Sequence, residues 1–399
     1  MTRDHVGGTV LLASLLAVLL VATAAPFAIA AEPSEAWGRH IVVFQDSFPG
    51  AAAQAALVRA FGGAAIRDLP IVNGMAVALP PGIAKQLARR AEVERIDMDV
   101  EVHALGRPAT PPGQDKQKNE QPPQQLPWGV DRIDAEAAWD YSLGSGVKVA
   151  VIDTGIDAGH PDLLVSGGVN YVSRPSWKPA NPNKWDDDSG HGTHVAGIIA
   201  ALDNEIGVVG VAPGASLYAV KVLDRTGSGY LSDVISGIEW CVANGVDIAN
   251  MSLGTDADIQ SFRDACNVAA AAGLLLVAAA GNDGIDVDYP GAYDSVIAVA
   301  ATDINDNRPS WSSPGPEVEV AAPGVAVYST WKGGAYETAS GTSMAAPHVS
   351  GTLALVLALT PSADPCTGAD PLAAAWTGCG LVDAGESVSG IPDYGDDLP

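Results

Sequence analysis

Large aromatic side chains and basic residues are both scarce in this 399-residue chain. Phe, Tyr and Trp make up 6% of it, and 21 Lys and Arg stand against 47 Asp and Glu, a formal net charge of −26 at pH 7. A surface of that sign repels the phosphates of nucleic acids and anionic lipids, so we expect neither as a partner. Glycine is abundant at 44 residues, which predicts many tight turns and close backbone approaches.

The negative charge lies almost entirely after residue 123. Residues 1–123 contain 12 acidic and 11 basic residues, whereas residues 124–399 contain 35 and 10, a net charge of −25 for the second part. A field of this strength suits bound cations and high salt concentrations. It also keeps a protein soluble without any further role, and the composition leaves both interpretations open.

Near its start the chain has an apolar run, residues 10–21, that is short for a membrane span. Arg3 precedes this run, and the small residues Ala28 and Ala30 follow it. This order is typical of a secretory signal peptide, so we expect residues 1–30 to be removed on export by the general secretory route. The mature protein is then secreted, extracellular and free of the membrane. An uncleaved anchor is the alternative.

Cysteine is rare, and its spacing argues against one kind of site. No two of the four cysteines have the Cys-x-x-Cys spacing typical of structural zinc sites. In an exported chain an even number permits two disulfides, and four cysteines allow three connectivities. We favour the two pairs whose members are close in sequence, Cys241–Cys266 and Cys366–Cys379.

Residues 31–105 are predicted to form a small α+β module with a core at about residues 40–105. The expected strands are residues 41–44, 71–79 with an interruption at Asn73 and Gly74, and 96–102. The expected helices are residues 51–61 and 83–91. Residues 106–123 contain Pro, Gln, Lys and Asn with almost no large apolar residue. We therefore expect an extended, exposed linker there, the kind of segment that proteases cut.

Residues 124–399 are predicted to form one α/β domain. Strand-like runs alternate with helical stretches, which indicates a mostly parallel sheet with helices on both faces. The expected strands are residues 147–152, 216–222, 246–251, 274–278 and 296–300, and the expected helices include residues 194–202, 230–243 and 259–272. Ligands bind such sheets outside the carboxyl ends of the strands.

Three residue types suited to acyl transfer stand at the ends of elements in this domain. Asp153 ends a buried strand, and His191 begins a helix between two glycines. Ser343 precedes an apolar helix, and Pro347 fixes the start of that helix close to Ser343 because proline is tolerated only near the first turn. A helix N-terminus favours the negative charge of an oxyanion. Each residue alone is explained as well by an ordinary strand end, helix start or N-cap. Their order along the chain nevertheless matches a known Asp, His, Ser triad.

The segments around these positions resemble the catalytic signatures of the subtilase family of serine proteases. The matching segments are residues 149–157, 190–197 and 341–349. The resemblance covers residues 124–384 and implies a subtilisin-like fold and a serine endopeptidase that works through an acyl-enzyme. In that reaction His191 takes the proton of Ser343 while Asp153 holds the imidazole. Asn282 resembles the residue that donates a hydrogen bond to the oxyanion.

The resemblance also implies where a protein or peptide substrate binds. The segment that would pair with the substrate backbone is Ser252, Leu253 and Gly254. The residues that would line the pocket for the side chain before the cut are Ala279, Gly281, Asp283 and Asp288. Two carboxylates there would favour Arg or Lys, whereas carboxylates that point into solvent would leave no such preference.

A calcium ion is the cofactor that the resemblance implies. The expected ligands are Gln124, Asp162, Leu202, Asn204, Ile206 and Val208. Three of them would act through backbone carbonyls and three through side-chain oxygens, which is the hard oxygen ligation that Ca2+ prefers. The alternative is that residues 202–208 form only a polar turn.

The N-terminal module, residues 31–105, resembles the inhibitory propeptide of the family. It would act as an intramolecular chaperone and then as an inhibitor, with its tail near residues 103–105 in the active-site cleft. Because a linker follows, cleavage is expected either near Leu105 or within residues 106–123.

Three rival functions remain open at this stage. A subtilase-like binding protein would use the cleft without cutting, and a selective processing protease would cut few partners. A metal hydrolase could use His191 and His194, which are spaced by about one helical turn. The compact chain, without an added C-terminal domain, favours an enzyme of broad, degradative activity. We expect this enzyme to be a monomer.

Overall fold

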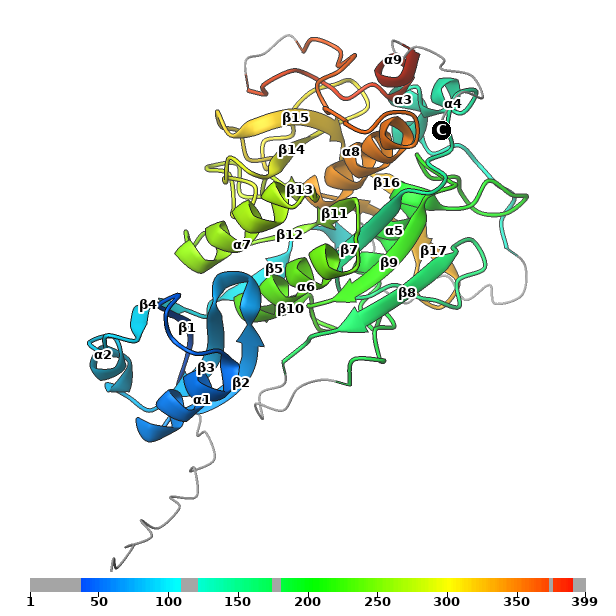
Figure 1. Ribbon diagram of the computed structural model, residues 1–399. Helices are drawn as coiled ribbons and strands as arrows, with labels where there is room; N and C mark the ends of the chain where they lie inside the picture. Colours follow the sequence, from blue (N-terminus) through cyan, green and yellow to red (C-terminus); the bar gives the residue numbers. More distant parts are fainter. Residues whose placement is uncertain (1–36, 109–120, 174–180, 373–375, 390–399) are drawn as a thin grey trace, which may run out of the picture.

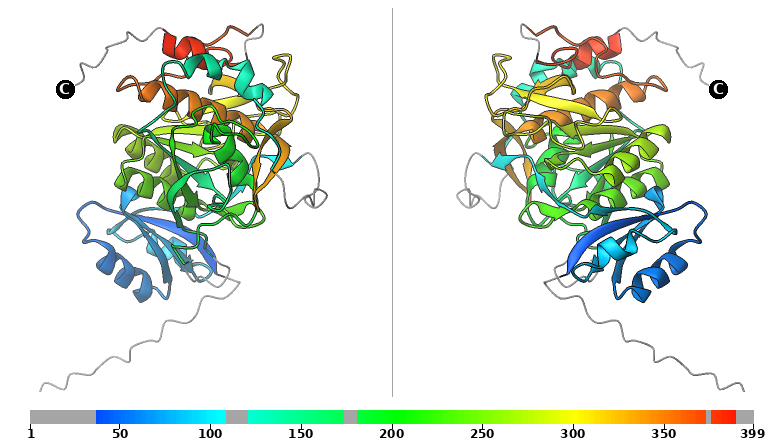
Figure 2. Two further views of the ribbon diagram at one scale, coloured as in Figure 1. Left: turned by 90° about the vertical axis from the view of Figure 1, so that its right-hand side faces the viewer. Right: turned by 90° about the vertical axis from the view of Figure 1, so that its left-hand side faces the viewer.

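The computed structural model describes residues 37–108, 121–173, 181–372 and 376–389. The expected signal peptide, residues 1–30, and most of the expected linker lie outside these residues. The described chain forms a small N-terminal module, drawn in blue, and a larger α/β domain (Figure 1). Side views place the module at one end of that domain (Figure 2). Across the described ranges, no helix has both the length and the apolar character that a membrane crossing requires.

The module is a four-stranded antiparallel sheet in the order β2-β3-β1-β4. Its elements are β1 (Gly38–Phe44), α1 (Ala51–Ala60), β2 (Ala64–Leu69), β3 (Gly74–Leu79), α2 (Ile83–Leu87) and β4 (Val93–Met98). Both helices bury an apolar residue against the sheet, Val58 from α1 and Leu87 from α2. The α+β class predicted for this module is therefore confirmed, although α2 is shorter than expected.

The strand expected at residues 71–79 begins only at Gly74, so its predicted start was wrong. Pro70–Val72 form a short 3-10 helix (η1), which ends where Asn73 adopts a left-handed conformation with a φ of 46°. Pro70 suits the first position because its fixed φ is helical and its missing N–H needs no partner there. The run expected at residues 96–102 is likewise divided, because β5 (Glu101–Ala104) leaves the sheet of the module.

The α/β domain is built on a seven-stranded parallel sheet in the order β15-β14-β13-β11-β7-β9-β8. Its strands are β7 (Lys148–Asp153), β8 (Val165–Asn170), β9 (Ser216–Lys221), β11 (Ile248–Met251), β13 (Leu275–Ala279), β14 (Ile297–Thr302) and β15 (Val318–Pro323). All five expected strands are present, and β8 and β15 were not predicted. Most of these strands are nearly continuous in apolar residues, as expected where both faces of a sheet are buried.

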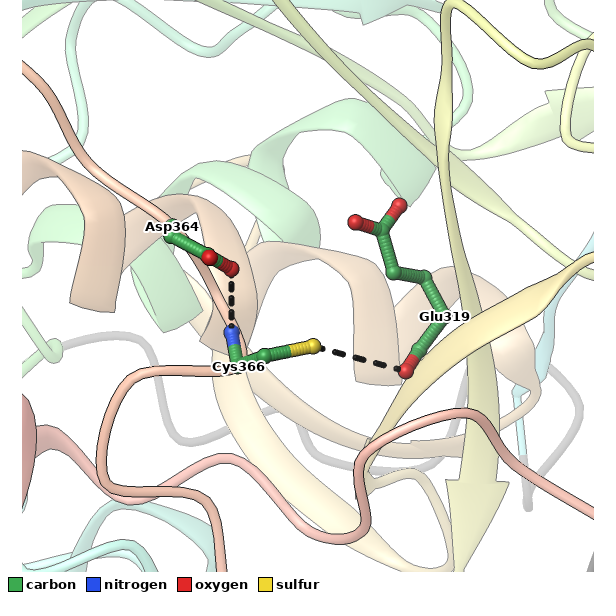
Figure 3. A group of neighbouring side chains, drawn as sticks. All are labelled: Glu319, Asp364 and Cys366. Atoms are coloured by element: carbon green, nitrogen blue, oxygen red, sulfur yellow. Dashed lines mark hydrogen bonds between the residues drawn. The ribbon is translucent and has the colours of Figure 1, made fainter.

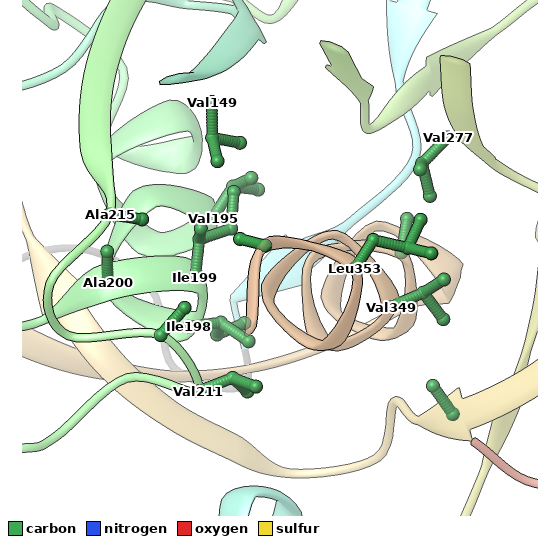
Figure 4. Packing of buried hydrophobic residues seen from close by; sticks show 14 of the residues in the cluster. Val149, Val195, Ile198, Ile199, Ala200, Val211, Ala215, Val277, Val349 and Leu353 are labelled. Atoms are coloured by element: carbon green, nitrogen blue, oxygen red, sulfur yellow. The ribbon is translucent and has the colours of Figure 1, made fainter. Parts of the chain in front are cut away.

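Helices cover both faces of this sheet, as predicted. One face carries α5 (His191–Ala200) and α8 (Thr342–Leu357), and the other carries α6 (Leu231–Ala243) and α7 (Gln260–Ala271). The helices α5 and α8 pack side by side (Figure 4). Val195 of α5 and Leu353 of α8 belong to the same buried apolar cluster on this face of the sheet. Short helices complete the domain: α3 (Trp128–Arg132), α4 (Ala135–Ala138) and α9 (Ala384–Ser389).

Two small sheets join the start of the chain to the α/β domain. Their strands from the domain are β10 (Ser228–Tyr230), β12 (Leu253–Gly254), β16 (Val327–Trp331) and β17 (Ala335–Ser340). β5 lies between β10 and β12, and β6 (Arg107–Pro108) pairs with β17. Leu105 and Gly106 lie between β5 and β6, so strand pairing holds the chain on both sides of these two residues.

One of the two expected disulfides is formed. Cys366 and Cys379 are bonded, as predicted, whereas the expected pair Cys241–Cys266 was wrong because both are free and buried. These two thiols stand on α6 and α7 within the apolar cluster beneath the helices, where cysteine behaves as a small hydrophobic residue. The Cys366 sulfur lies near Glu319 and Asp364 (Figure 3). Because this sulfur is bonded to Cys379, it is not available as a thiolate ligand for a metal ion.

Candidate active site

Asp153 and His191 meet at the carboxyl edge of the central sheet. Asp153 is the last residue of β7 and His191 the first of α5. The Nδ1 atom of His191 lies 2.8 Å and 2.9 Å from the two carboxylate oxygens of Asp153, and both side chains are buried. Burial lowers the pKa of His191, but the charge and hydrogen bond of Asp153, together with the charge of Asp187, outweigh burial and raise the pKa above its ordinary value.

A second buried carboxylate, Asp187, organises the turn before His191, and sequence analysis did not single it out. It accepts hydrogen bonds from the backbone N–H groups of Ser189, Gly190 and Thr193 and from the hydroxyls of Thr154 and Thr193. Gly190 has a φ of +114°, and a Cβ there would run into the ring of Trp331, so only glycine fits. The signal in the sequence was a run of aspartates at residues 186–188, which is too general to indicate this role.

Ser343 is buried in the first turn of α8, and Pro347 determines what surrounds it. Proline has no backbone N–H, so the carbonyl of Ser343, four residues earlier, lacks its helical partner. The Ser252 hydroxyl donates to that carbonyl over 2.8 Å, and the Ser343 hydroxyl donates to the Ser252 carbonyl over 2.9 Å. The Nε2 atom of His191 has no hydrogen-bond partner within the described chain, so the histidine and serine side chains are not yet hydrogen-bonded to each other.

Asn282 follows β13 and is held by the start of α8. Its Oδ1 accepts hydrogen bonds from the backbone N–H of Thr342 at 2.9 Å and from the Thr342 hydroxyl at 3.0 Å. The amide nitrogen therefore faces the other way, where it donates to the carbonyl oxygen of Leu105. The residue predicted as the oxyanion donor thus contacts a peptide carbonyl of the same chain.

Gly106, the residue that follows the Leu105 carbonyl, lies against His191. A Cβ placed on Gly106 would lie 2.8 Å from Nε2 of His191 and 3.1 Å from the sulfur of Met344, the residue after Ser343. A hollow of about 310 Å³ borders this point. The Leu105–Gly106 peptide bond therefore lies between the histidine, the start of α8 and the Asn282 amide.

β5 occupies the groove that the sequence predicted for substrate. Ala104 is paired with Leu253 and His103 with Gly254, and the N–H of Leu105 donates to the Ser252 carbonyl over 3.1 Å. The second wall of the groove, β10, was not predicted. Its glycine-rich sequence before α6 was the available signal, but it reads as an ordinary turn.

The side chain of Leu105 points at the predicted pocket. A Cβ on Gly254 would lie 2.9 Å from a terminal carbon of Leu105 and 3.0 Å from the Cβ of Asp288, and a Cβ on Gly281 would lie 2.9 Å from an Asp288 oxygen. Burial, together with the charges of Asp283 and Asp256, raises the pKa of Asp288 to about 6. One predicted carboxylate thus borders the pocket beside two glycines.

The remaining predicted wall residues are Asp283 and Ala279. Asp283 is exposed, and its carboxylate accepts hydrogen bonds from the Ser313 hydroxyl and the Ile285 N–H, both at 2.9 Å. That carboxylate is therefore engaged in the local turn. Ala279 is buried as the last residue of β13.

The expected calcium ligands lie together around one buried carboxylate. Asp162 is fully buried and accepts hydrogen bonds from Asn204 at 2.8 Å, from the N–H of Val208 at 3.0 Å and from Tyr336 at 3.1 Å. Within the described ranges, no Lys or Arg contacts it. Gln124 is brought to the same loop by the bridges of its two neighbours, Pro123 with Ile206 and Gln125 with Val208. A buried carboxylate with only neutral partners fits a cation.

His194 does not face His191 as a second metal ligand. Its Nε2 atom lies 3.1 Å from the carbonyls of Val327 and Glu337, and the side chain is fully buried. Burial and the neighbouring His191 lower its pKa to about 3, so it is neutral. The structure therefore gives no support to the metal-hydrolase alternative.

A parallel sheet that presents Asp, His and Ser in this order at its carboxyl edge is the architecture of a serine endopeptidase of the subtilisin type. Comparison with known proteins agrees, since the profile of the subtilase family matches residues 144–375. The chain belongs to the subtilase family.

Characterised relatives share much of the sequence. Subtilisin E of Bacillus subtilis is 40% identical over 360 residues, which cover 88% of each chain. The thermostable alkaline protease of Halalkalibacterium halodurans is 52% identical over 242 residues, 60% of this chain and 64% of the relative. Subtilisin DY of Bacillus licheniformis is 50% identical over 246 residues, 60% of this chain and 87% of the relative.

Proposed function

We propose that this chain is a secreted, calcium-stabilised endopeptidase that processes its own precursor by cutting the Leu105–Gly106 bond. The observation that carries the proposal is the contact between Asn282 and the Leu105 carbonyl, with Gly106 against His191. The site residues of this proposal are Asp153, His191 and Ser343 as the triad and Asn282 as the oxyanion donor.

The reaction begins with rotation of the Ser343 side chain from the Ser252 carbonyl toward Nε2 of His191. Neutral His191 takes the hydroxyl proton as Oγ attacks the Leu105 carbonyl carbon, and Asp153 stabilises the imidazolium. The oxyanion is held by Asn282 and the N–H of Ser343. His191 then protonates the Gly106 nitrogen as the peptide bond breaks, and water releases the acyl group. The same steps apply to protein substrates bound in place of β5.

After the cut, the module, residues 31–105, acts as an inhibitor. Its tail stays paired with β10 and β12, so the groove is closed to other substrates. The sheet contacts also support the proposed chaperone role, because they bring together segments far apart in the chain. Residues 106–123 then form the start of the mature protein, and residues 124–399 its catalytic domain.

The apolar run and the small residues within residues 1–30 support export. The resulting enzyme acts outside the cell, as a monomer, on protein substrates. Calcium binding is supported by a separate group of residues. Gln124, Asp162 and Asn204 would hold Ca2+ through side-chain oxygens, together with the carbonyls of Leu202, Ile206 and Val208. The ion would fix the loop onto which the segment around Gln124 is bridged.

Asp288 supports a narrower proposal about specificity. Its carboxylate borders the pocket that Leu105 enters, so a bound Arg or Lys side chain would neutralise it. Cleavage of one peptide series with Arg, Phe or Leu before the cut tests this preference. An equal rate after all three would remove Asp288 from the specificity of the enzyme.

The test of the main proposal compares the secreted protein with its Ser343→Ala variant on casein, with and without a serine-directed covalent inhibitor. We expect hydrolysis by the uninhibited parent alone, and mass spectrometry should find the Leu105–Gly106 bond cut in the parent and intact in the variant. Equal cutting by both would mean that Ser343 is not the nucleophile. A folded parent that cuts its own junction but not casein would indicate the selective processing protease. Failure to cut either would indicate a binding protein.

A further inference from the structure

An arginine of the N-terminal module enters the α/β domain outside the catalytic residues. Arg67 stands on β2, the edge strand of the module, directly after an irregularity in the pairing of β2 with β3. Such bulges re-aim the neighbouring side chain. The Arg67 side chain is only 13% exposed, although it belongs to the surface of the module.

The site that receives Arg67 is built entirely from the α/β domain. The Nη1 atom lies 3.1 Å from Oδ1 of Asp233, the third residue of α6. The Nη2 atom donates to the Tyr171 carbonyl over 2.7 Å, and the guanidinium carbon lies 5.0 Å from the centre of the Tyr171 ring. A carboxylate, a carbonyl and an aromatic face are groups that recognise a guanidinium.

The carboxylate of this site is held in place without help from the module. Ser173 donates to Asp233 through its backbone N–H over 2.8 Å and through its hydroxyl over 2.6 Å. The Asp233 side chain is 1% exposed, and burial raises its pKa to about 6 although the charge of Arg67 opposes that rise. In the precursor a carboxylate buried this deeply is costly without a cation, and Arg67 supplies that cation.

We propose that Asp233, Tyr171 and Ser173 form a guanidinium-binding site of the protease domain, which Arg67 fills in the precursor. Once the module has left, the same site takes an arginine of another polypeptide bound to the enzyme. Lysine is the weaker ligand, because its compact ammonium lacks the planar fork that places one nitrogen beside the Asp233 carboxylate while another donates to the Tyr171 carbonyl. The second occupancy rests on the proposed function, since the module must first be released.

Chemical rescue in an uncleavable chain tests the site without any need for activity. In full-length Ser343→Ala protein, Arg67→Ala should lower the Tm, and millimolar ethylguanidinium should restore part of the loss. Ethylammonium at the same ionic strength should not. Adding Asp233→Asn should abolish the rescue. Arg59→Ala, which removes an exposed arginine from α1 of the same module, is the matched control and should change neither the Tm nor the response.

The milder Arg67→Lys variant keeps the test decisive if Arg67→Ala does not fold. It should also lower the Tm, and in the active chain it should shorten the delay between cleavage and the appearance of proteolytic activity by about tenfold or more. Equal Tm values for the parent and Arg67→Lys, or rescue that persists with Asp233→Asn, would overturn the site. Cleavage of Leu105–Gly106 in the Ser343→Ala chain would instead overturn the proposed function and leave the rescue result intact.

Discussion

Asn282 is oriented by one neighbour toward one peptide carbonyl. Thr342 donates twice to its Oδ1, so the amide hydrogens have only one direction left, and in that direction lies the carbonyl of Leu105. A donor fixed before the reaction loses no free energy to reorientation when the oxyanion forms. The residue type was expected from the resemblance, but the part played by Thr342 depends on a contact across 60 residues.

Replacement of Asn282 should therefore act on the chemical step. We expect Asn282→Ala to lower kcat by about 10²–10³ with little change in KM; this range comes from measurements on a subtilisin rather than from the present geometry. Steady-state kinetics on a chromogenic peptide measure both constants. Asn305→Ala, in an exposed turn, serves as the control. A loss confined to KM would assign Asn282 to substrate binding instead.

The proposed pocket carboxylate, Asp288, should make specificity depend on pH. Burial and neighbouring carboxylates raise its pKa to about 6, so it is mostly neutral below that pH and charged above it. A charged carboxylate attracts Arg, whereas a neutral one suits Leu. The ratio of kcat/KM for Arg over Leu peptides should therefore rise between about pH 5 and pH 8. Asp288→Asn should flatten that rise, and a parallel slope in parent and variant would contradict the assignment.

Elements with a continuous apolar pattern were predictable, and elements set by remote contacts were not. All five expected sheet strands are apolar along most of their length and are present. β2 was missed because Arg67 and Asp68 interrupt its apolar pattern. The Arg67 side chain forms an ion pair with Asp233 of α6 and does not join the core of the module. The prediction of a disulfide between α6 and α7 was wrong for a related reason. Closeness in sequence does not reveal the direction in which each helix presents its thiol.

The two free cysteines of α6 and α7 should become accessible only when the protein unfolds. Cys241 and Cys266 are buried, and burial raises the pKa of both thiols, so an alkylating reagent should reach them only after unfolding. Mass spectrometry without reduction should then count two modified thiols per chain. No modified thiol in the unfolded protein would show that the two are bonded.

The Cys366–Cys379 disulfide should contribute to stability. It closes a loop with a sequence separation of 13, so replacing both Cys366 and Cys379 by Ser should lower the free energy of unfolding by about 3 kcal/mol. Denaturant titration measures this change. An unchanged midpoint would mean that the segment it closes is already restrained in the unfolded chain.

The loop that contains Asn204 should depend on calcium. EDTA should lower the Tm of the parent, because an ion that binds only the folded state at 100 times its Kd contributes about 2.7 kcal/mol. Excess Ca2+ should restore the Tm, and Asp162→Asn should remove most of the response. Glu205→Gln, which removes an exposed charge nearby, is the control. A Tm insensitive to EDTA in the parent would leave the loop as a polar turn.

Over the whole molecule, the sequence was informative about the identity of the site and less so about its assembly. The proposed triad residues and Asn282 could be named from local segments because their motifs are short and continuous. The cleavage position that we propose could not be named in this way, since it depends on Leu105 meeting Ser252 and Asn282 across more than a hundred residues. Asp187 was missed because carboxylates are common before a helix.

Strand pairing on both sides of Leu105 and Gly106 has a consequence for reaction order. The bond is presented by the same chain that carries Ser343, so its effective concentration at the nucleophile is set by the fold and not by the amount of protein in solution. Conversion of the precursor should therefore be first order, with a half-time that stays constant on dilution. A half-time that lengthens as the protein is diluted would mean that one molecule cuts another. Digestion of other proteins, by contrast, must slow on dilution, because there the two reactants have to meet.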